Sequence, residues 1–100
     1  MKNITKTQII DKVSKRTGER KDLTMKMVHE TFTVIREMIC SADPEIRINI
    51  RDFGTIEVLK TKGRTNARNP QTNEPVKVEP HRRTHFIAGQ VIRDFLKRPL

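Results

Sequence analysis

The segment from residue 60 to residue 83 carries the side chains with the clearest chemistry. It holds seven basic and two acidic residues, a net charge of +5, and its first sixteen residues include no large apolar side chain. Cationic side chains on an extended hairpin can follow a phosphate backbone and release its counterions. A solvated loop is the alternative that charge alone leaves open. The seven basic residues are Lys60, Lys62, Arg64, Arg68, Lys77, Arg82 and Arg83.

The centre of this segment reads Arg68-Asn69-Pro70-Gln71-Thr72. Pro70 offers a rigid apolar ring without a backbone donor, and Arg68 and Asn69 beside it carry donors suited to acceptors on a groove floor. Asn-Pro also favours a turn for its own sake, so turn chemistry explains part of the pattern. With roughly eight residues a side at about 3.3 Å each, the hairpin would reach about 26 Å, enough to follow a groove around a duplex.

Other kinds of site find little support. Cys40 is the single cysteine, so an intrachain disulfide and a paired-cysteine metal site are excluded, and we interpret it as a small apolar helix residue rather than a reactive thiol. His81 and His85 lie in strand-like surroundings, and with His29 they form no ligand set. No phosphate-cradling glycine loop or nucleophile–base set is present, so we expect no enzyme, cofactor, metal or small-molecule substrate.

Size and composition narrow the partner. The chain has 100 residues, 34% of them hydrophobic, with four phenylalanines as the only aromatic residues. So small a core favours one domain that a second subunit completes. The net charge of +9 indicates a polyanionic partner. Nucleic acid is favoured over a membrane, because no apolar stretch of about 18 residues and no signal-type segment is visible. We expect a cytoplasmic protein.

Two helices are predicted before the strands. Thr5 and Gln8 fit a capping box, which begins a helix over residues 5–17 that Gly18 can end. A second helix starts near Asp22 or Thr24, either of which can cap, and ends at residues 42–44. Its apolar stripe is wide enough for two faces, one for the first helix and the other for either an ordinary core or a subunit interface. The stripe comprises Met27, Val28, Thr31, Phe32, Val34, Ile35, Met38, Ile39 and Ala42.

Strands follow from residue 45. Isoleucines at 46, 48 and 50 alternate with polar residues, and a turn at Asp52-Phe53-Gly54 leads into a second extended run over 55–59. Further strands are predicted over 76–79 and 84–88, with Pro80 at an edge or bulge. The predicted class is α+β in one domain. Residues 1–44 form a helical base, 45–87 a three-stranded antiparallel sheet with an arm at about 60–76, and 88–98 a short C-terminal helix.

These features together resemble a known family, the bacterial HU and integration host factor proteins. The order of helices, hairpin, arm, strand and short helix agrees over essentially the whole chain. The arm-tip sequence is the most specific part of the resemblance. The matching segments are Asp52-Phe53-Gly54-Thr55, Ala67-Arg68-Asn69-Pro70-Gln71-Thr72, and Phe86 followed by Ala88-Gly89-Gln90.

The resemblance implies an intertwined dimer, either a homodimer or a heterodimer with a paralogue, whose two β-arms embrace double-stranded DNA at the nucleoid. The resemblance also implies that Pro70 inserts between base pairs, as the matching proline does in this family of minor-groove proteins, with Arg68 and Asn69 beside it in the groove. The phosphate path along the arm would then be lined by Lys60, Lys62, Arg64, Lys77, Arg82 and Arg83. Flanking phosphates would be held on the body by Lys6, Gln90 and Arg93.

Three departures from the family pattern bear on this interpretation. Asn73 replaces a usual Gly and tolerates positive φ, so the tip turn is expected to persist. Ile87 replaces a usual Arg and removes a charge from the surface facing flanking DNA. The run 80–83 is also atypical. We therefore interpret the chain as an architectural protein that bends and compacts DNA with low or moderate sequence preference. The alternative is a basic RNA-binding or ribosome-associated protein.

Overall fold

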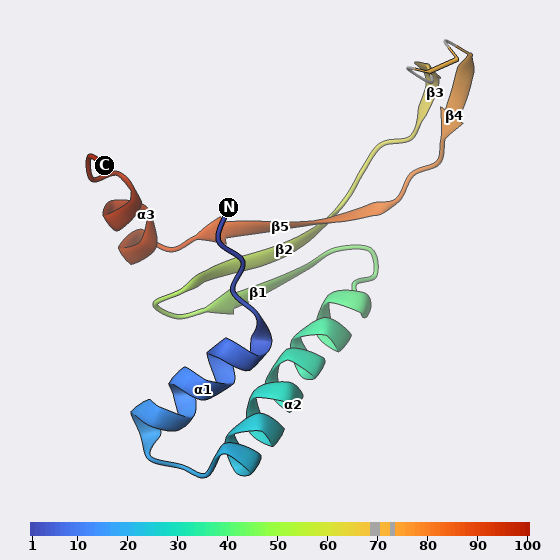
Figure 1. Cartoon of the computed structure of the whole chain (residues 1–100). Helices are drawn as coiled ribbons and strands as arrows, with labels where there is room; N and C mark the ends of the chain where they lie inside the picture. Colours follow the sequence, from blue (N-terminus) through green and yellow to red (C-terminus); the bar gives the residue numbers. More distant parts are fainter. Residues whose placement is uncertain (69–70, 73) are drawn as a thin grey trace. The chain divides into compact units, whose positions relative to one another are not determined.

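The computed structural model describes residues 1–68, 71–72 and 74–100 (Figure 1). These fall into two compact units, a helical unit over Met1–Cys40 and a sheet unit over Ser41–Leu100. The asparagine and proline predicted for the arm tip, Asn69 and Pro70, lie outside the described residues, as does Asn73.

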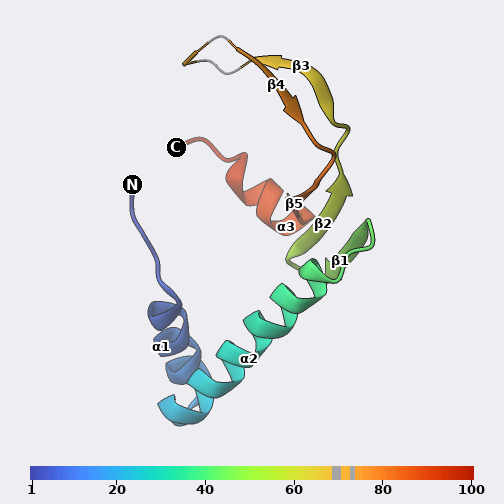
Figure 2. The ribbon, with the colours of Figure 1, turned by 90° about the vertical axis from the view of Figure 1, so that its right-hand side faces the viewer.

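The helical unit is a hairpin of α1, Lys6–Thr17, and α2, Lys21–Cys40 (Figure 2). The backbone N–H of Thr5 donates to Gln8 Oε1 at 2.8 Å, the reciprocal half of a capping box. Gly18 ends α1 at φ 74°, a left-handed conformation that costs glycine little. Both predicted boundaries of the first helix are confirmed.

The second helix begins at Lys21, one residue before Asp22 and three before Thr24, the two residues predicted as caps. The N–H of Thr24 donates to the carbonyl of Arg20 at 3.0 Å, so both predicted caps already lie inside the first helical turn. Asp22 lies in the first turn, where its negative charge interacts favourably with the positive end of the helix dipole. Thr24 is only 4% exposed, and its hydroxyl also donates to the Arg20 carbonyl. The helix ends at Cys40, two residues before the predicted range, and this cysteine is exposed.

The apolar stripe of α2 divides into two faces within this chain. One is buried or half-buried at helical spacing, at Thr24, Val28, Ile35 and Ile39. The other stays exposed, and its large side chains are Met27, Phe32, Val34 and Met38. Because a helix buries its apolar stripe in a stable protein, this second face requires a cover that the described chain does not supply.

The sheet unit is built on three antiparallel strands in the order β1-β2-β5. These are β1, Ile46–Ile50, β2, Gly54–Lys60, and β5, Arg82–Ala88. The predicted three-stranded sheet and its first hairpin are thereby confirmed. Asp52 takes the single positive φ among the described non-glycine residues, 61°, in the turn between β1 and β2.

The register sorts the sheet residues onto two faces, because side chains directly opposite each other point to the same side. The row Ile48, Ile56 and Phe86 belongs to an apolar face. The row Arg47, Glu57 and His85 belongs to a polar face, together with Asn49, Thr55 and Ile87. Val58, on the apolar face, is 3% exposed, whereas Phe86 is 52% exposed. The apolar face, like α2, is incompletely covered.

Two glycines allow the β1–β2 turn to contact the end of β5. A Cβ on Gly54 would lie 2.6 Å from the carbonyl oxygen of Ile87, and one on Gly89 would lie 2.8 Å from that of Phe53. The N–H of Gly89 donates to the same Phe53 carbonyl at 2.8 Å. This contact sets where α3, Gln90–Leu96, begins. The predicted C-terminal helix is present but shorter than the range 88–98.

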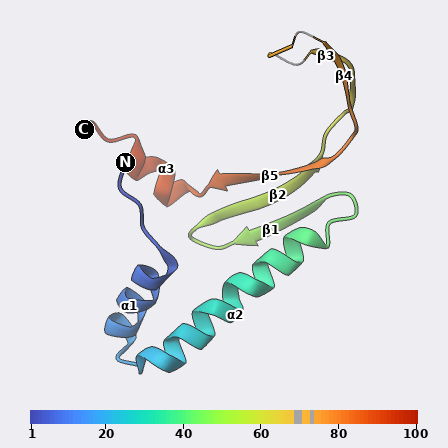
Figure 3. The same ribbon diagram turned by 45° about the vertical axis from the view of Figure 1, so that its right-hand side comes forward.

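The arm consists of β3, Arg64–Arg68, and β4, Pro75–Val78, which form a separate two-stranded antiparallel sheet (Figure 3). Arg64 pairs with Val78 and Arg68 with Pro75, with an irregularity between Arg64 and Ala67. Gln71 and Thr72 lie in a turn. The arm therefore extends two residues beyond the predicted end at 76.

Candidate nucleic-acid interface

Six of the seven basic residues singled out in the sequence lie on strands of the arm or of the sheet that supports it, and Lys62 lies in the segment between β2 and β3. Lys60 ends β2, and Lys62 follows it as an exposed residue. Arg64 and Arg68 begin and end β3, and Lys77 belongs to β4. Arg82 and Arg83 open β5. The structure thus brings together charges that are separated by up to 23 positions in the chain.

Two neighbouring arginines at the base of the arm have different surroundings. Arg83 pairs with Leu59 and so belongs to the polar face. Arg82 pairs with Lys60, on the side of the sheet that carries Val58, and its guanidinium donates to the backbone carbonyl of Ala42. Part of the hydrogen-bonding capacity of Arg82 is therefore used within the protein.

The polar face of the sheet adds basic residues that the sequence analysis did not select. Arg47 and Arg51 lie on β1 and just after it, and His85 lies opposite Glu57. The Nη2 of Arg47 lies 3.0 Å from Oε2 of Glu57, with the arginine 71% and the glutamate 14% exposed. The alternation of these residues with isoleucines was the available signal, since one face of a half-buried strand must be polar.

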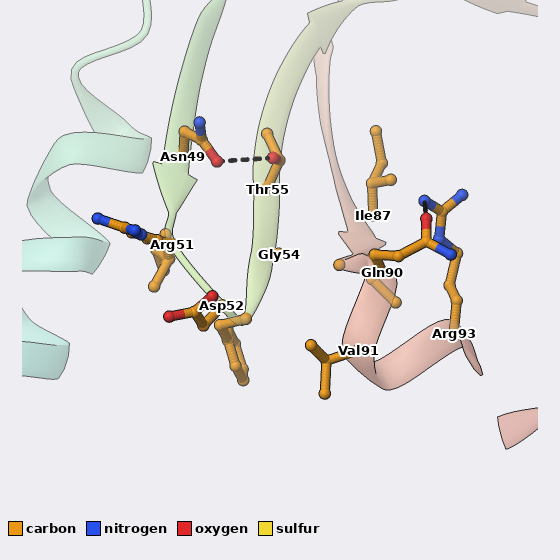
Figure 4. A pocket seen from close by; sticks show the side chains of 13 residues that line it. Asn49, Arg51, Asp52, Gly54, Thr55, Ile87, Gln90, Val91 and Arg93 are labelled. Atoms are coloured by element: carbon orange, nitrogen blue, oxygen red, sulfur yellow. Dashed lines mark hydrogen bonds between the residues drawn. The ribbon is translucent and has the colours of Figure 1, made fainter. Parts of the chain in front are cut away.

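A groove of about 560 Å³ lies where the β1–β2 turn meets the start of α3 (Figure 4). Its lining includes Arg51 together with Gln90 and Arg93, the two residues predicted for the body. Arg93 Nη2 donates to Gln90 Oε1 at 2.9 Å, and Gln90 Nε2 donates to Oδ1 of Asp94 at 2.7 Å. These bonds orient two groups that can bind an anion. Arg51 lines the opposite side of the groove, and its side chain points away from Gln90 and Arg93 (Figure 4).

Across this groove, the sheet contributes polar groups of its own. Thr55 Oγ1 donates to Asn49 Oδ1 at 3.3 Å, and both residues line the groove with Asp52 (Figure 4). Ile87 lies beside them as an apolar wall. The groove lining therefore combines two arginines with one acidic residue and several neutral donors, groups of the kind that contact phosphates.

Lys6, the remaining predicted contact, lies in the first turn of α1 in the helical unit. Its Nζ is 3.0 Å from Nδ1 of His29, so the ammonium donates to the ring nitrogen when that nitrogen is unprotonated. Among the residues that the structure describes, no group of three or more His, Cys, Asp or Glu side chains is placed to hold a metal ion. In the same part of the chain, no helix is long and apolar enough to cross a membrane.

Comparison with known proteins decides the family. The model of the family described as bacterial DNA-binding protein matches residues 4–97. The chain belongs to this family. The resemblance to HU proteins noted in the sequence is thereby confirmed, and the family accounts for the helices, sheet and arm together.

Individual relatives in the family match nearly end to end. The DNA-binding protein HU of Thermus thermophilus is 29% identical over 97 residues, which cover 97% of this chain and 96% of that protein. The DNA-binding protein HU-1 of Halalkalibacterium halodurans is 31% identical over 94% of this chain and its own full length. The Anabaena HU–DNA cocrystal structure superposes with a TM-score of 0.81 at 26% identity, covering 96% of this chain and 100% of that one.

Proposed function

We propose that this chain binds double-stranded DNA through the minor groove and bends it, as an architectural protein rather than an enzyme. The observation that carries the proposal is the concentration of seven basic residues on the arm and its supporting strands. Family membership and the likeness to an HU protein crystallised with DNA support duplex DNA as the ligand. They favour it over folded RNA, the alternative raised by charge alone.

The proposed functional unit is a dimer, with a second copy of this chain or a paralogue as partner. The exposed face of α2 and the half-exposed Phe86 on the apolar face of the sheet are the surfaces that such a partner would cover. Burial of large apolar side chains of this kind stabilises obligate dimers, whose monomers are rarely stable alone. Two subunits would present two arms to one duplex.

Within this unit, we assign three roles to the candidate residues. Arg68, Asn69 and Pro70 would enter the minor groove, with the proline as the wedge that unstacks one base step. The other basic residues of the arm and its base would follow the phosphates, namely Lys60, Lys62, Arg64, Lys77 and Arg83. Arg82 takes no part in this path, because its guanidinium donates to the carbonyl of Ala42. Gln90 and Arg93, with Lys6 on α1, would hold phosphates beside the bent region.

Bending a duplex of binding-site length costs on the order of 1–6 kcal/mol, which these arm and body contacts would offset only on bent DNA. Preference among sites would then arise largely from the deformability of the DNA. This mode of action requires no catalytic group, and it places the protein with the nucleoid.

Substitution of Pro70 tests the proposal. We expect Pro70→Ala to reduce the bend angle of a duplex labelled at both ends for energy transfer, and to weaken binding, because the apolar wedge is lost. Pro99→Ala, at the C-terminal end of the chain, is the matched control and is expected to leave both quantities unchanged. An unaltered bend angle in Pro70→Ala would remove the wedge from the mechanism.

A further inference from the structure

The arm is joined to the sheet by two short segments outside the strands, residues 61–63 and 79–81, which we call the junction (Figure 1). Pairing of β2 with β5 ends at Lys60 and Arg82, and pairing of β3 with β4 begins at Arg64 and Val78. Where the strand pairing is interrupted in this way, the arm can pivot relative to the three-stranded sheet. A defined arm direction therefore requires other contacts at its base.

Such contacts come from the linker between α2 and β1, residues 41–45. The side chain of Glu45 accepts a hydrogen bond at Oε2 from the backbone N–H of Lys60, at 3.1 Å. Three residues earlier, the carbonyl of Ala42 accepts from the Arg82 guanidinium. Ala42 itself is 2% exposed, so the linker is anchored where it makes this contact. One linker thus holds the last paired residue of both strands.

The junction itself is closed by one pair of residues. The N–H of Thr61 donates to the carbonyl of His81 at 2.7 Å, and the N–H of His81 donates to Thr61 Oγ1 at 3.2 Å. Pro80, directly before His81, has a fixed φ and no donor to satisfy, so it stiffens the chain at a point where no ladder bond is needed. Pro80, His81 and Arg82, in the atypical segment 80–83, therefore have a structural role at the base of the arm.

The negative charge of Glu45 also supports a role in positioning the arm. An acidic side chain at Lys60, within the basic segment, opposes the attraction of that segment to phosphates. A negative charge at this place therefore weakens DNA binding unless it has another role. Its bond to a backbone N–H is charge-assisted, the stronger class of hydrogen bond. Holding the arm in its DNA-competent direction lowers the cost of ordering it on binding.

We propose that Glu45 and Arg82 are positioning residues that clamp the base of the arm and thereby fix the direction in which it leaves the sheet. The clamp rests on the proposed function, because the direction of the arm matters only if the arm bends DNA. Arg82 then acts through the Ala42 carbonyl and not through a phosphate, unlike Arg83 beside it.

Two substitutions of Glu45 isolate the hydrogen bond from the charge. Glu45→Ala and Glu45→Gln remove the same negative charge, but only the glutamine keeps an oxygen that can accept from the Lys60 N–H. In the full-length protein without DNA, we expect the amide protons of Lys60 and Thr61 to exchange ~10-fold faster in Glu45→Ala than in Glu45→Gln. Equal exchange in the two variants would overturn the clamp. Because this measurement involves no DNA, it stands even if the proposed function fails.

With duplex DNA, the same pair separates positioning from binding. We expect Glu45→Ala to give a smaller or broader distribution of bend angles than Glu45→Gln, while both share one dependence of affinity on salt. Arg82→Ala is the second test, and it should broaden the bend without changing the salt dependence, with partial rescue in Arg82→Lys. A slope reduced by about 0.9 per subunit in Arg82→Ala would assign Arg82 to a phosphate and remove it from the clamp. Wild-type protein that fails to bind duplex DNA would refute the proposed function instead.

Discussion

Replacing Lys62 by alanine tests whether the arm follows phosphates. Lys62 is exposed, lies two residues after the end of β2 and belongs to the segment that carries most of the excess charge. Its side chain contributes one positive charge to each arm. If that charge neutralises a phosphate, binding releases one counterion fewer per arm in the Lys62→Ala variant. Affinity should then depend less steeply on salt.

The expected size follows from the number of arms. Each lost phosphate contact lowers the slope of log affinity against log salt by ~0.9, so a dimer with two arms loses ~1.8. Between about 50 and 200 mM salt, the wild-type protein should therefore lose ~12-fold more affinity than the variant. At low salt the variant binds more weakly, and the two affinities converge as salt rises.

The assay is fluorescence anisotropy of a labelled duplex of roughly 30 base pairs, titrated at four or more salt concentrations. Lys26→Ala is the matched control, since Lys26 is an exposed lysine on α2 and its loss changes the net charge by the same amount. A slope unchanged in Lys62→Ala would show that Lys62 contacts no phosphate. An equal fall in both variants would show that only net charge matters, and that the arm has no special role.

Two further predictions concern the scaffold. Gly54→Ala should destabilise the protein by about 1–3 kcal/mol, because the new Cβ would lie 2.6 Å from the Ile87 carbonyl oxygen. Thermal unfolding at fixed protein concentration measures the loss, with Gly63→Ala, at an exposed glycine, as the control. An unfolding midpoint equal to that of the control would contradict the close approach. Phe32→Asp should abolish the dimer, because it places a charge on the exposed apolar face of α2. Light scattering measures the mass of the particle, and Lys26→Asp is the control. A dimer as stable in Phe32→Asp as in Lys26→Asp would show that this face is not the interface.

Local signals in the sequence were sufficient for the first helix. Its cap at Thr5 and its stop at Gly18 depend on backbone groups within four residues of each, so no distant contact was needed to choose them. The second helix was different. Both Asp22 and Thr24 have side chains that can cap, so local chemistry did not choose between them. In the structure the helix begins at Lys21, and Thr24 is buried with its hydroxyl bonded to the Arg20 carbonyl.

The candidate site shows the same division. Charge counting identified the arm, and the sequence around Pro70 identified the family, because both are properties of a continuous stretch of chain. The sequence could not distinguish the roles of Arg82 and Arg83, because they are adjacent residues of the same type. Nor could it join Arg51 to Gln90 and Arg93, nearly forty positions away, in one groove.

The sequence by itself determined the elements, their order, the basic arm and the family, since each depends on local patterning or on motifs. Tertiary structure decided which residue faces which way. Side chains alternate along a strand, so the pairing of β5 with β2 sends Arg83 to the polar face and Arg82 toward the linker. That register, and the bonds from Glu45 and Arg82 that hold the base of the arm, arise only when segments 15 to 40 residues apart are brought together.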